Sequence, residues 1–369
     1  MFPQEEKTAA ETCDSQPDIF EVYLNPRRQQ AAKERRPFEV DFEITTQCFG
    51  SCKICHTSSI PTDRRFMPLE KIQEVIDQLV ELRISQIWWE GGDPLVHPNI
   101  FEAVHYAAEK GLKNAIFTSG LPLTRKICQH ICDHFARKEI NLIGVHIDAL
   151  DPEVYSRLHW EPKGLEKKIK GYRSLLEVGY PADRILPCLT MTRPALEVIE
   201  ETLDWYIDEM GAKFVEMTVF KPQGLGGQNR ELEPSLSDLR RAFEYRAKKL
   251  GNPKWLQMGT TECSSIRCQT NFYICTDGTV KICPCIPPDI YPIGNVYKES
   301  LPEVFRRQGH QLTMNHLTIQ GQCAECENNT DGICRGCRAS AYHYLGDFEA
   351  SDPKCWLNPA AKETYLHEE

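Results

Sequence analysis

Three cysteines stand close together at Cys48, Cys52 and Cys55, with the spacing C-x3-C-x2-C. They follow a strand-like run, residues 38–45, so the sequence predicts them on a loop at the end of a strand. Three closely spaced thiolates fit an iron–sulfur cluster better than a zinc ion, because zinc usually takes four protein ligands in paired knuckles. A 4Fe–4S cluster held by three cysteines keeps one iron free for an outside ligand.

Composition limits the class of protein. The chain has 369 residues, 17 cysteines and a formal net charge of −10. That charge argues against nucleic-acid binding, which needs a basic surface. No run approaches about 18 apolar residues, so no membrane helix is expected. The polar residues 1–10 do not resemble a secretory signal, and many cysteines without one indicate metal or redox chemistry in a reducing, cytoplasmic setting.

The elements that must position the triplet alternate between strand-like and helical patterns. In residues 69–82 the apolar positions keep steps of three and four, as on one face of a helix. Right-handed crossovers would wind such units into a parallel barrel, or an open barrel-like sheet, with its site at the carboxyl ends of the strands. The six predicted strand–helix pairs are 38–45 with 69–82, 86–89 with 100–110, 114–118 with 125–135, 142–148 with 165–178, 184–190 with 196–210 and 214–220 with 237–250.

Polar residues follow several of these strands. After the second strand, Gly91 and Gly92 let the backbone approach a ligand, and the carboxylate of Asp93 can bind an ammonium group. Further candidates at strand ends are Thr118, Ser119, Asp148, Thr190, Glu216 and Lys221, the last two and Asp148 as contacts to substrate or ribose. Elsewhere, Cys128, Cys132 and Cys188 are expected to pack as small hydrophobic residues.

The triplet and these motifs together resemble the radical S-adenosylmethionine (radical SAM) superfamily, over roughly residues 38–357. The resemblance implies an α/β fold, a partial (β/α)6 TIM-like barrel at residues 37–250. It implies a 4Fe–4S cluster on the triplet whose free iron chelates SAM. Asp93 replaces the family's glutamate. The residues implied to contact SAM are Gly91, Gly92, Asp93, Thr118, Ser119, Asp148 and Thr190.

Cysteines crowd the C-terminal part of the chain. Residues 271–281, with Asp277-Gly278 between two strand-like runs, predict a β-hairpin. Two C-x2-C pairs follow, and by themselves they favour a structural zinc site. The ten cysteines of this part are Cys263, Cys268, Cys275, Cys283, Cys285, Cys323, Cys326, Cys334, Cys337 and Cys355.

With residues 293–296 (Ile-Gly-Asn-Val), these cysteines resemble the SPASM extension of radical SAM enzymes. The resemblance implies a small domain at residues 258–357 with two auxiliary clusters, three clusters in all. A polar arm, residues 1–36, with a solvated helix, and a tail, residues 358–369, would flank the two domains. The implied ligands are Cys263, Cys268, Cys283 and Cys337 for the first auxiliary cluster, with Cys275 and Cys285 as substitutes for Cys263, and Cys323, Cys326, Cys334 and Cys355 for the second.

The resemblance also implies an oxygen-sensitive oxidoreductase or maturase. One electron, from a ferredoxin or flavodoxin-type donor, would cleave SAM to a 5′-deoxyadenosyl radical that abstracts hydrogen from a peptide or cofactor-type intermediate. Dehydrogenation or decarboxylation of a haem precursor or sugar-type molecule is the alternative. Sulfatase maturation is disfavoured, because Pro284 stands where those enzymes carry an aspartate.

Two other classes of protein remain open from the residues alone. A multi-cluster electron-transfer protein needs the cysteines but neither the polar motifs at the strand ends nor the six strand–helix units. A zinc-binding interaction protein needs only the paired knuckles.

Overall fold

The computed structural model describes residues 26–57, 63–261, 267–287, 289–312, 314 and 316–366. Its sheet has nine strands in the order β6-β5-β4-β3-β2-β1-β7-β8-β9. The strands are β1 (Glu39–Glu43), β2 (Gln86–Glu90), β3 (Lys113–Thr118), β4 (Leu142–His146), β5 (Ile185–Met191), β6 (Glu216–Val219), β7 (Asn271–Ile274), β8 (Thr279–Lys281) and β9 (Gly294–Asn295).

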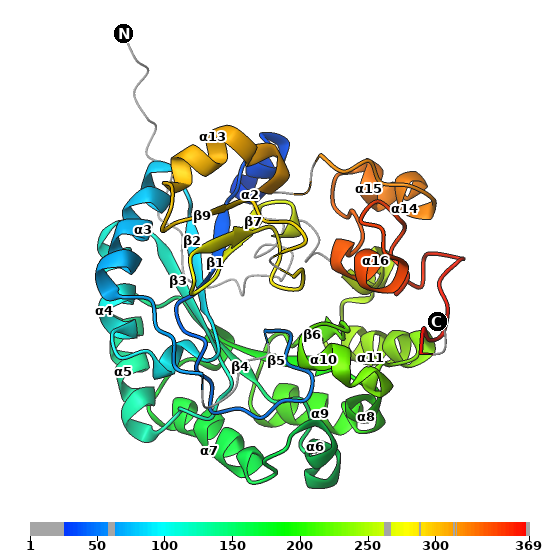
Figure 1. Ribbon diagram of the computed structural model, residues 1–369. Coiled ribbons are helices and arrows are strands. Elements are labelled where there is room, and N and C mark those ends of the chain that lie inside the picture. The colour runs from blue at the N-terminus through cyan, green and yellow to red at the C-terminus, as the bar shows by residue number, and fades with distance from the viewer. Residues whose placement is uncertain are drawn as a thin grey trace.

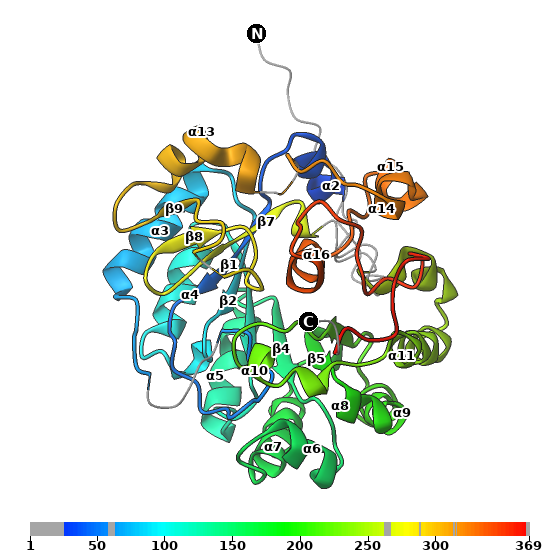
Figure 2. The same cartoon turned by 45° about the vertical axis from the view of Figure 1, so that its right-hand side comes forward.

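Strands β1 to β6 are all parallel, and helices cover their outer side (Figures 1 and 2). The sheet does not close, because β6 and β9 are its two edges. The expected partial barrel is therefore confirmed. The α-helices are α2 (Pro26–Lys33), α3 (Leu69–Glu81), α4 (Ile100–Glu109), α5 (Arg125–Ala136), α6 (Pro152–Leu158), α7 (Gly164–Glu177), α8 (Arg193–Glu197), α9 (Ile199–Asp204), α10 (Leu225–Gln228), α11 (Leu236–Lys249), α13 (Leu301–Leu312), α14 (Gln322–Glu325), α15 (Glu327–Thr330) and α16 (Arg338–Leu345).

The main core fills the space between the sheet and this layer of helices. Helix α3 buries Ile72, Val75, Ile76 and Leu79, the apolar face that the sequence pattern predicts. Burying such a side chain fully contributes about 1.5–3 kcal/mol relative to leaving it exposed. None of the helices in the described ranges combines the length and the hydropathy needed to cross a bilayer.

One predicted helix needs correction, and one helix was not predicted. The helix expected over residues 196–210 begins at Arg193 and is interrupted at Val198, whose backbone (φ −123°, ψ 22°) is not helical; a π-helical segment, Trp205–Glu209, follows α9. Helix α6 was not predicted, although Asp151 caps it through a 2.8 Å bond from the Val154 amide and proline follows the cap.

The predicted hairpin is confirmed, but it is not separate from the barrel. Strands β7 and β8 pair antiparallel, while β7 also pairs parallel with β1. The sheet thus runs across the domain boundary predicted after residue 250, which stays a prediction.

Buried ion pairs join the N-terminal helix to this strand pair. Arg28 of α2 donates two bonds, of 2.9 and 2.8 Å, to the Glu39 carboxylate of β1. Arg28 is 1% exposed, so the expectation of a solvated helix is wrong at this residue. Arg267, before β7, pairs with both Glu39 and Asp41. These contacts fix β1 between its two parallel neighbours.

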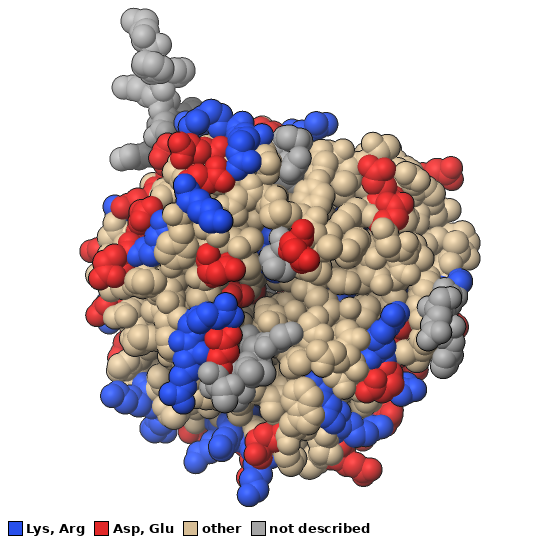
Figure 3. All heavy atoms as spheres, in the orientation of Figure 1, with Lys and Arg blue, Asp and Glu red and all other residues tan. Residues whose placement is uncertain are grey.

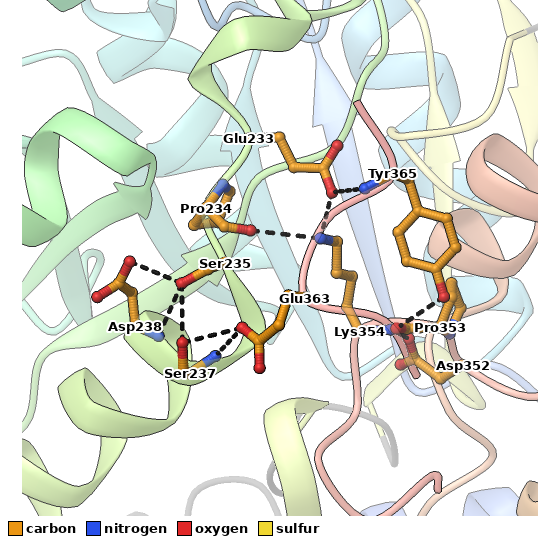
Figure 4. A network of polar contacts seen from close by, with 10 residues as sticks. All are labelled: Glu233, Pro234, Ser235, Ser237, Asp238, Asp352, Pro353, Lys354, Glu363 and Tyr365. Carbon is orange, nitrogen blue, oxygen red and sulfur yellow. Dashed lines mark hydrogen bonds and ion pairs between the residues drawn. The ribbon is translucent and has the colours of Figure 1, made fainter. Parts of the chain in front are cut away.

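A second buried network ties the C-terminal segment to the barrel (Figure 4). The Lys354 ammonium pairs with Glu233, and both side chains are at most 1% exposed. Glu233 also accepts a 2.9 Å bond from the Tyr365 amide. Glu363 accepts bonds from the amide and hydroxyl of Ser237, in the first turn of α11. The segment after Cys355 is thereby held against the start of α11.

Replacing Glu233 with alanine is expected to lower the free energy of unfolding by about 3 kcal/mol, because it leaves the Lys354 ammonium buried without its counter-ion. Urea titration of wild type and variant, matched in metal content, measures this change.

The control is Glu244→Ala, which breaks the exposed Arg240–Glu244 pair of α11 and should cost less than about 0.5 kcal/mol. Equal losses in the two variants would contradict a special role for the buried pair.

Candidate active site

A cavity of about 410 Å³ opens at the carboxyl ends of the barrel strands. Its lining comes from the loop after β1, the ends of β2 to β6, and segments near residues 267–285 and 336–354. Figure 3 shows the molecule hollowed near the centre of the view, inside the ring of helices of Figure 1. The barrel and the cysteine-rich part thus share one cavity.

The triplet Cys48, Cys52 and Cys55 lines this cavity on the loop after β1, as the sequence predicts. The Gly50 amide donates a 3.1 Å bond to Cys48 Sγ. A Cβ added at Gly50 would lie 3.1 Å from Cys48 Sγ and 3.5 Å from Cys52 Sγ, so two sulfurs close around this glycine. Thiol sulfurs that accept backbone N–H bonds suit an iron–sulfur cluster, whose potential such bonds adjust.

A buried cation lies beside the triplet. Lys168 of α7 is fully buried and donates a 3.0 Å bond to the His146 carbonyl. Burial raises the pKa of Cys48 to about 12 and that of Cys52 higher still, and the Lys168 charge opposes the rise at both thiols. Because its positive charge favours the thiolate form, Lys168 supports metal binding by these cysteines.

Sequence reasoning missed Lys168. The signal was present, because the lysine interrupts the apolar face of the predicted helix between Leu165 and Tyr172, both of which are buried. A lysine at a core position needs a specific partner.

Glycine is required at the two positions after β2 because the backbone there passes very close to the backbone of the loop after β1. A Cβ at Gly91, whose φ is +149°, would lie 2.3 Å from the Thr45 carbonyl oxygen, and one at Gly92 would lie 2.2 Å from that of Gln47. The Gly92 amide donates to the Thr45 carbonyl at 2.7 Å. Both glycines line the cavity beside the cysteine loop.

Asp93 is fully buried and does not line the cavity. Its carboxylate accepts bonds from the Ser119 amide (2.8 Å) and hydroxyl (2.6 Å), the Thr118 hydroxyl (2.8 Å) and the Leu95 amide (3.1 Å). Thr118 and Ser119 do line the cavity. Asp93 therefore fastens the loop after β2 to the end of β3, and its contact with an ammonium group stays a prediction.

Asp148 occupies an equivalent buried position. It accepts bonds from His146 Nε2 (2.9 Å), His159 Nε2 (3.1 Å) and the Thr190 amide (2.9 Å). Although burial alone would raise the pKa of Asp148, these two histidines hold it well below its usual range. His146 and Thr190, rather than Asp148, line the cavity. The direct contact predicted for Asp148 is untested, and the missed residue here is His146.

Four C-terminal cysteines line the same cavity as the triplet: Cys268, Cys283, Cys285 and Cys337. Amides donate to two of their sulfurs, that of Cys285 to Cys283 Sγ (3.4 Å) and that of Ser340 to Cys337 Sγ (3.4 Å). Burial lowers the pKa of Lys221, but the cysteines at 337, 285 and 283 raise it above its ordinary value overall. Lys221 is thus a cation that lies beside these C-terminal cysteines. Of the other predicted ligands, Cys263 lies outside the described residues and Cys275 is not in the lining.

The remaining cysteines meet at a smaller cavity of about 20 Å³, lined by Cys323, Cys326, Cys334 and Cys355. The Asp352 amide donates to Cys323 Sγ and the Gly336 amide to Cys334 Sγ, each at 3.3 Å. A Cβ at Gly259, whose φ is +66°, would lie 2.4 Å from Cys355 Sγ. Gly336 lines both cavities. Four sulfurs in one pocket form a donor set suited to an iron–sulfur cluster.

Comparison with known proteins agrees with this geometry. Residues 42–213 match the Radical SAM superfamily. The barrel thus carries a Radical SAM domain. It is 23% identical over 362 residues to an AdoMet-dependent heme synthase of Methanosarcina barkeri, covering 90% of this chain and 99% of the relative. It is 24% identical over 339 residues to a PqqA peptide cyclase of Streptomyces rochei, covering 86% of this chain and 88% of the relative.

The fold is similar to that of SuiB of Streptococcus suis, solved bound to S-adenosylmethionine, with a TM-score of 0.67 at 17% identity. The match covers 91% of this chain and 82% of SuiB, so it extends into the cysteine-rich part. SuiB has also been solved bound to its precursor peptide SuiA. The predicted radical SAM fold is confirmed, and the likeness to SuiB continues into the part for which the sequence predicts a SPASM extension.

Replacing Lys168 with methionine is expected to make the midpoint potential of a cluster on Cys48, Cys52 and Cys55 more negative, because the lost charge stabilised the reduced form. Anaerobic redox titration followed by electron paramagnetic resonance measures the shift.

Lys167→Met is the matched control, since Lys167 is the exposed neighbour on the same helix. Identical potentials in wild type and Lys168→Met would contradict the role given to the buried lysine.

Proposed function

We propose that this enzyme cleaves SAM reductively and oxidises a peptide by hydrogen abstraction. One observation carries the proposal: a single cavity is lined both by the triplet and by Cys268, Cys283 and Cys337. A substrate in that cavity lies between a site that generates a radical and a site that accepts an electron.

We assign the radical-generating cluster to Cys48, Cys52 and Cys55. When bound, the clusters and SAM supply one electron and a 5′-deoxyadenosyl radical. Cys268, Cys283 and Cys337 would hold a cluster able to accept the electron that a substrate retains after giving up a hydrogen atom, and a proton would leave to solvent where a new bond forms. The buried cations Lys168 and Lys221 lie beside the two sets of thiols and stabilise their ionised forms.

We assign the auxiliary clusters to the cysteines implied by the SPASM resemblance. Cys323, Cys326, Cys334 and Cys355 hold one, in the smaller cavity. The other takes Cys268, Cys283 and Cys337, with a fourth ligand from Cys263 or Cys285. Position supports Cys285, because it lines the same cavity as the other three.

For SAM, we propose contacts with Gly91, Gly92, Thr118, Ser119 and Thr190, which all line the cavity near the triplet. Asp93 and Asp148 act from behind this layer as positioning residues. Asp93 orients Thr118 and Ser119, while Asp148 orients His146 and the Thr190 amide. Fixing these groups before binding reduces the entropy lost when SAM is ordered.

Peptide oxidation is favoured by two similarities: the relative named PqqA peptide cyclase and the fold of SuiB, which binds a precursor peptide. A second candidate is oxidation of a haem precursor, supported by the heme synthase that matches over 99% of its own length. Activity assays with candidate precursor peptides and with haem precursors separate the two. Mass spectrometry shows which substrate is converted to a product of lower mass.

The wild-type protein, prepared without oxygen and reduced with dithionite, is expected to convert SAM to 5′-deoxyadenosine. The Cys48→Ala, Cys52→Ala, Cys55→Ala triple variant should lose this activity, because it lacks the ligands of the proposed cluster. Chromatography of the nucleoside product measures both.

The double variant Cys128→Ala, Cys132→Ala is the control, since these cysteines lie on α5 outside the cavity lining. It should retain the activity. Persistence of cleavage in the triple variant would overturn the cluster assignment, and an electron-transfer protein would show no cleavage in any of the three.

Iron and acid-labile sulfide are expected at about twelve of each per chain, for three 4Fe–4S clusters. The variant Cys326→Ala, Cys334→Ala should lose about four of each while still cleaving SAM. Elemental and sulfide analysis measures both quantities; zinc without sulfide would indicate the zinc-binding alternative.

A further inference from the structure

The charges at the base of the large cavity are unequally paired. Arg267 and Asp41 line the cavity, and Arg28 and Glu39 lie behind them; the two arginines form ion pairs with the two carboxylates. Two arginines thus match two carboxylates. Arg267 also lies over the Trp88 ring, 4.9 Å from its centre, which holds the guanidinium in place.

Two further carboxylates line the same cavity without such partners. Glu90, the last residue of β2, makes no side-chain hydrogen bond or ion pair with any residue that the structure describes. Glu216, the first residue of β6, accepts only a long 3.8 Å contact from the Cys188 thiol within the same described residues. Both side chains are only partly exposed, within the cavity. An ionised carboxylate that is partly removed from water gains from a cationic partner, so the two groups indicate a partner that arrives from outside.

The other cations of the cavity are already engaged. Lys221 Nζ donates to the Val219 carbonyl at 2.8 Å and lies among the C-terminal cysteines. Lys354 pairs with Glu233, and His146 pairs with Asp148. None of these groups, all in the described part of the chain, forms an ion pair with Glu90 or Glu216. The Arg267 charge acts on both carboxylates, but Arg267 is already paired with Glu39 and Asp41.

Neutral acceptors in the same cavity lining are also unsatisfied. Asn271 lines the cavity and is 6% exposed; its amide nitrogen donates to Asp41 at 2.6 Å, but its Oδ1 has no partner. Thr260, also 6% exposed in the lining, has an unpartnered hydroxyl. A ligand group that offers several N–H donors would satisfy both the charges and these acceptors.

Glu90 lies between the residues proposed to contact SAM and the C-terminal cysteines. It directly precedes Gly91 at the end of β2, and its charged neighbours are Asp41, Arg267, Glu216 and Cys285. None of these is among the groups that act on Cys48 and Cys52, which are Asp93, Asp148, Lys168 and the other cysteines of the triplet. A cationic side chain at Glu90 and Glu216 would therefore extend from the SAM site toward the C-terminal cysteines.

We propose that the peptide substrate presents a lysine or arginine side chain whose cationic group is bound by Glu90 and Glu216. This inference rests on the proposed function and specifies its substrate. It also disfavours a haem precursor, because the carboxylates of a tetrapyrrole would meet two unpaired carboxylates of like charge.

The test measures binding to the anaerobic holoprotein at saturating SAM by calorimetry. The probes are the blocked peptides Ac-Gly-Gly-X-Gly-Gly-NH2, where X is lysine, arginine or norleucine. The lysine or arginine peptide is expected to bind at least about tenfold more tightly than the norleucine peptide, which has an apolar side chain of similar size.

Glu90→Gln and Glu216→Gln should each reduce this preference about tenfold while leaving the affinity for SAM unchanged. Glu166→Gln, an exposed change on α7, is the matched control and should preserve both. The wild-type comparison needs no variant, so a variant that folds poorly does not decide the result.

Three outcomes would overturn the inference: no preference for the cationic peptides, loss of SAM affinity in Glu90→Gln, or tighter binding of coproporphyrin III, a tetracarboxylate, than of either cationic peptide. The SAM cleavage assay is run on the same preparations. Absence of cleavage there counts against the proposed function, whereas cleavage without a preference for cationic peptides counts against this inference alone.

Discussion

The arrangement of the site depends on strand β1 having two parallel neighbours. On one side it pairs with β2, as the first strand of a β/α barrel does, and on the other with β7 from the cysteine-rich part. Arg28 and Arg267 hold this arrangement through Glu39 and Asp41, four charged groups that are stable in the interior only because they are paired. Without the β1–β7 pairing, the two groups of cysteines would not face the same cavity.

The same constraint explains why buried polar residues are concentrated at the carboxyl ends of the strands. Backbones meet closely there, as at Gly91 and Gly92, and leave little room for side chains. Asp93 and Asp148 take up the hydrogen-bond donors of neighbouring loops and fix their positions. The positions of these loops are therefore fixed where SAM is proposed to bind, next to the unpaired carboxylate of Glu90 at the end of β2.

Much of this could be predicted from the sequence. Helix α3 and the parallel strands follow from periodicity, because that pattern reports directly which face is buried. The cysteines that meet in each cavity were grouped from their spacing and their resemblance to a known extension.

Contacts between residues far apart in the chain could not be predicted in this way. Nothing local shows that β7 pairs with β1, that Lys168 lies beside Cys52, or that Glu90 lacks a cation, since each depends on residues far apart in the chain. The interruption at Val198 was missed because the apolar pattern continues through it.

Gly336 connects the two cavities, since it lines both of them. Its φ is +66°, and a Cβ there would lie 3.1 Å from Cys323 Sγ and 2.6 Å from the guanidinium of Arg338. Gly336 thus separates the two cavities at this point without a side chain of its own. Electron transfer slows steeply with distance. A short path through the Gly336 backbone would therefore favour electron transfer between clusters bound at the two cysteine sites. The residue that is smallest for steric reasons would then also determine how fast an oxidised substrate discharges its electron toward the second site.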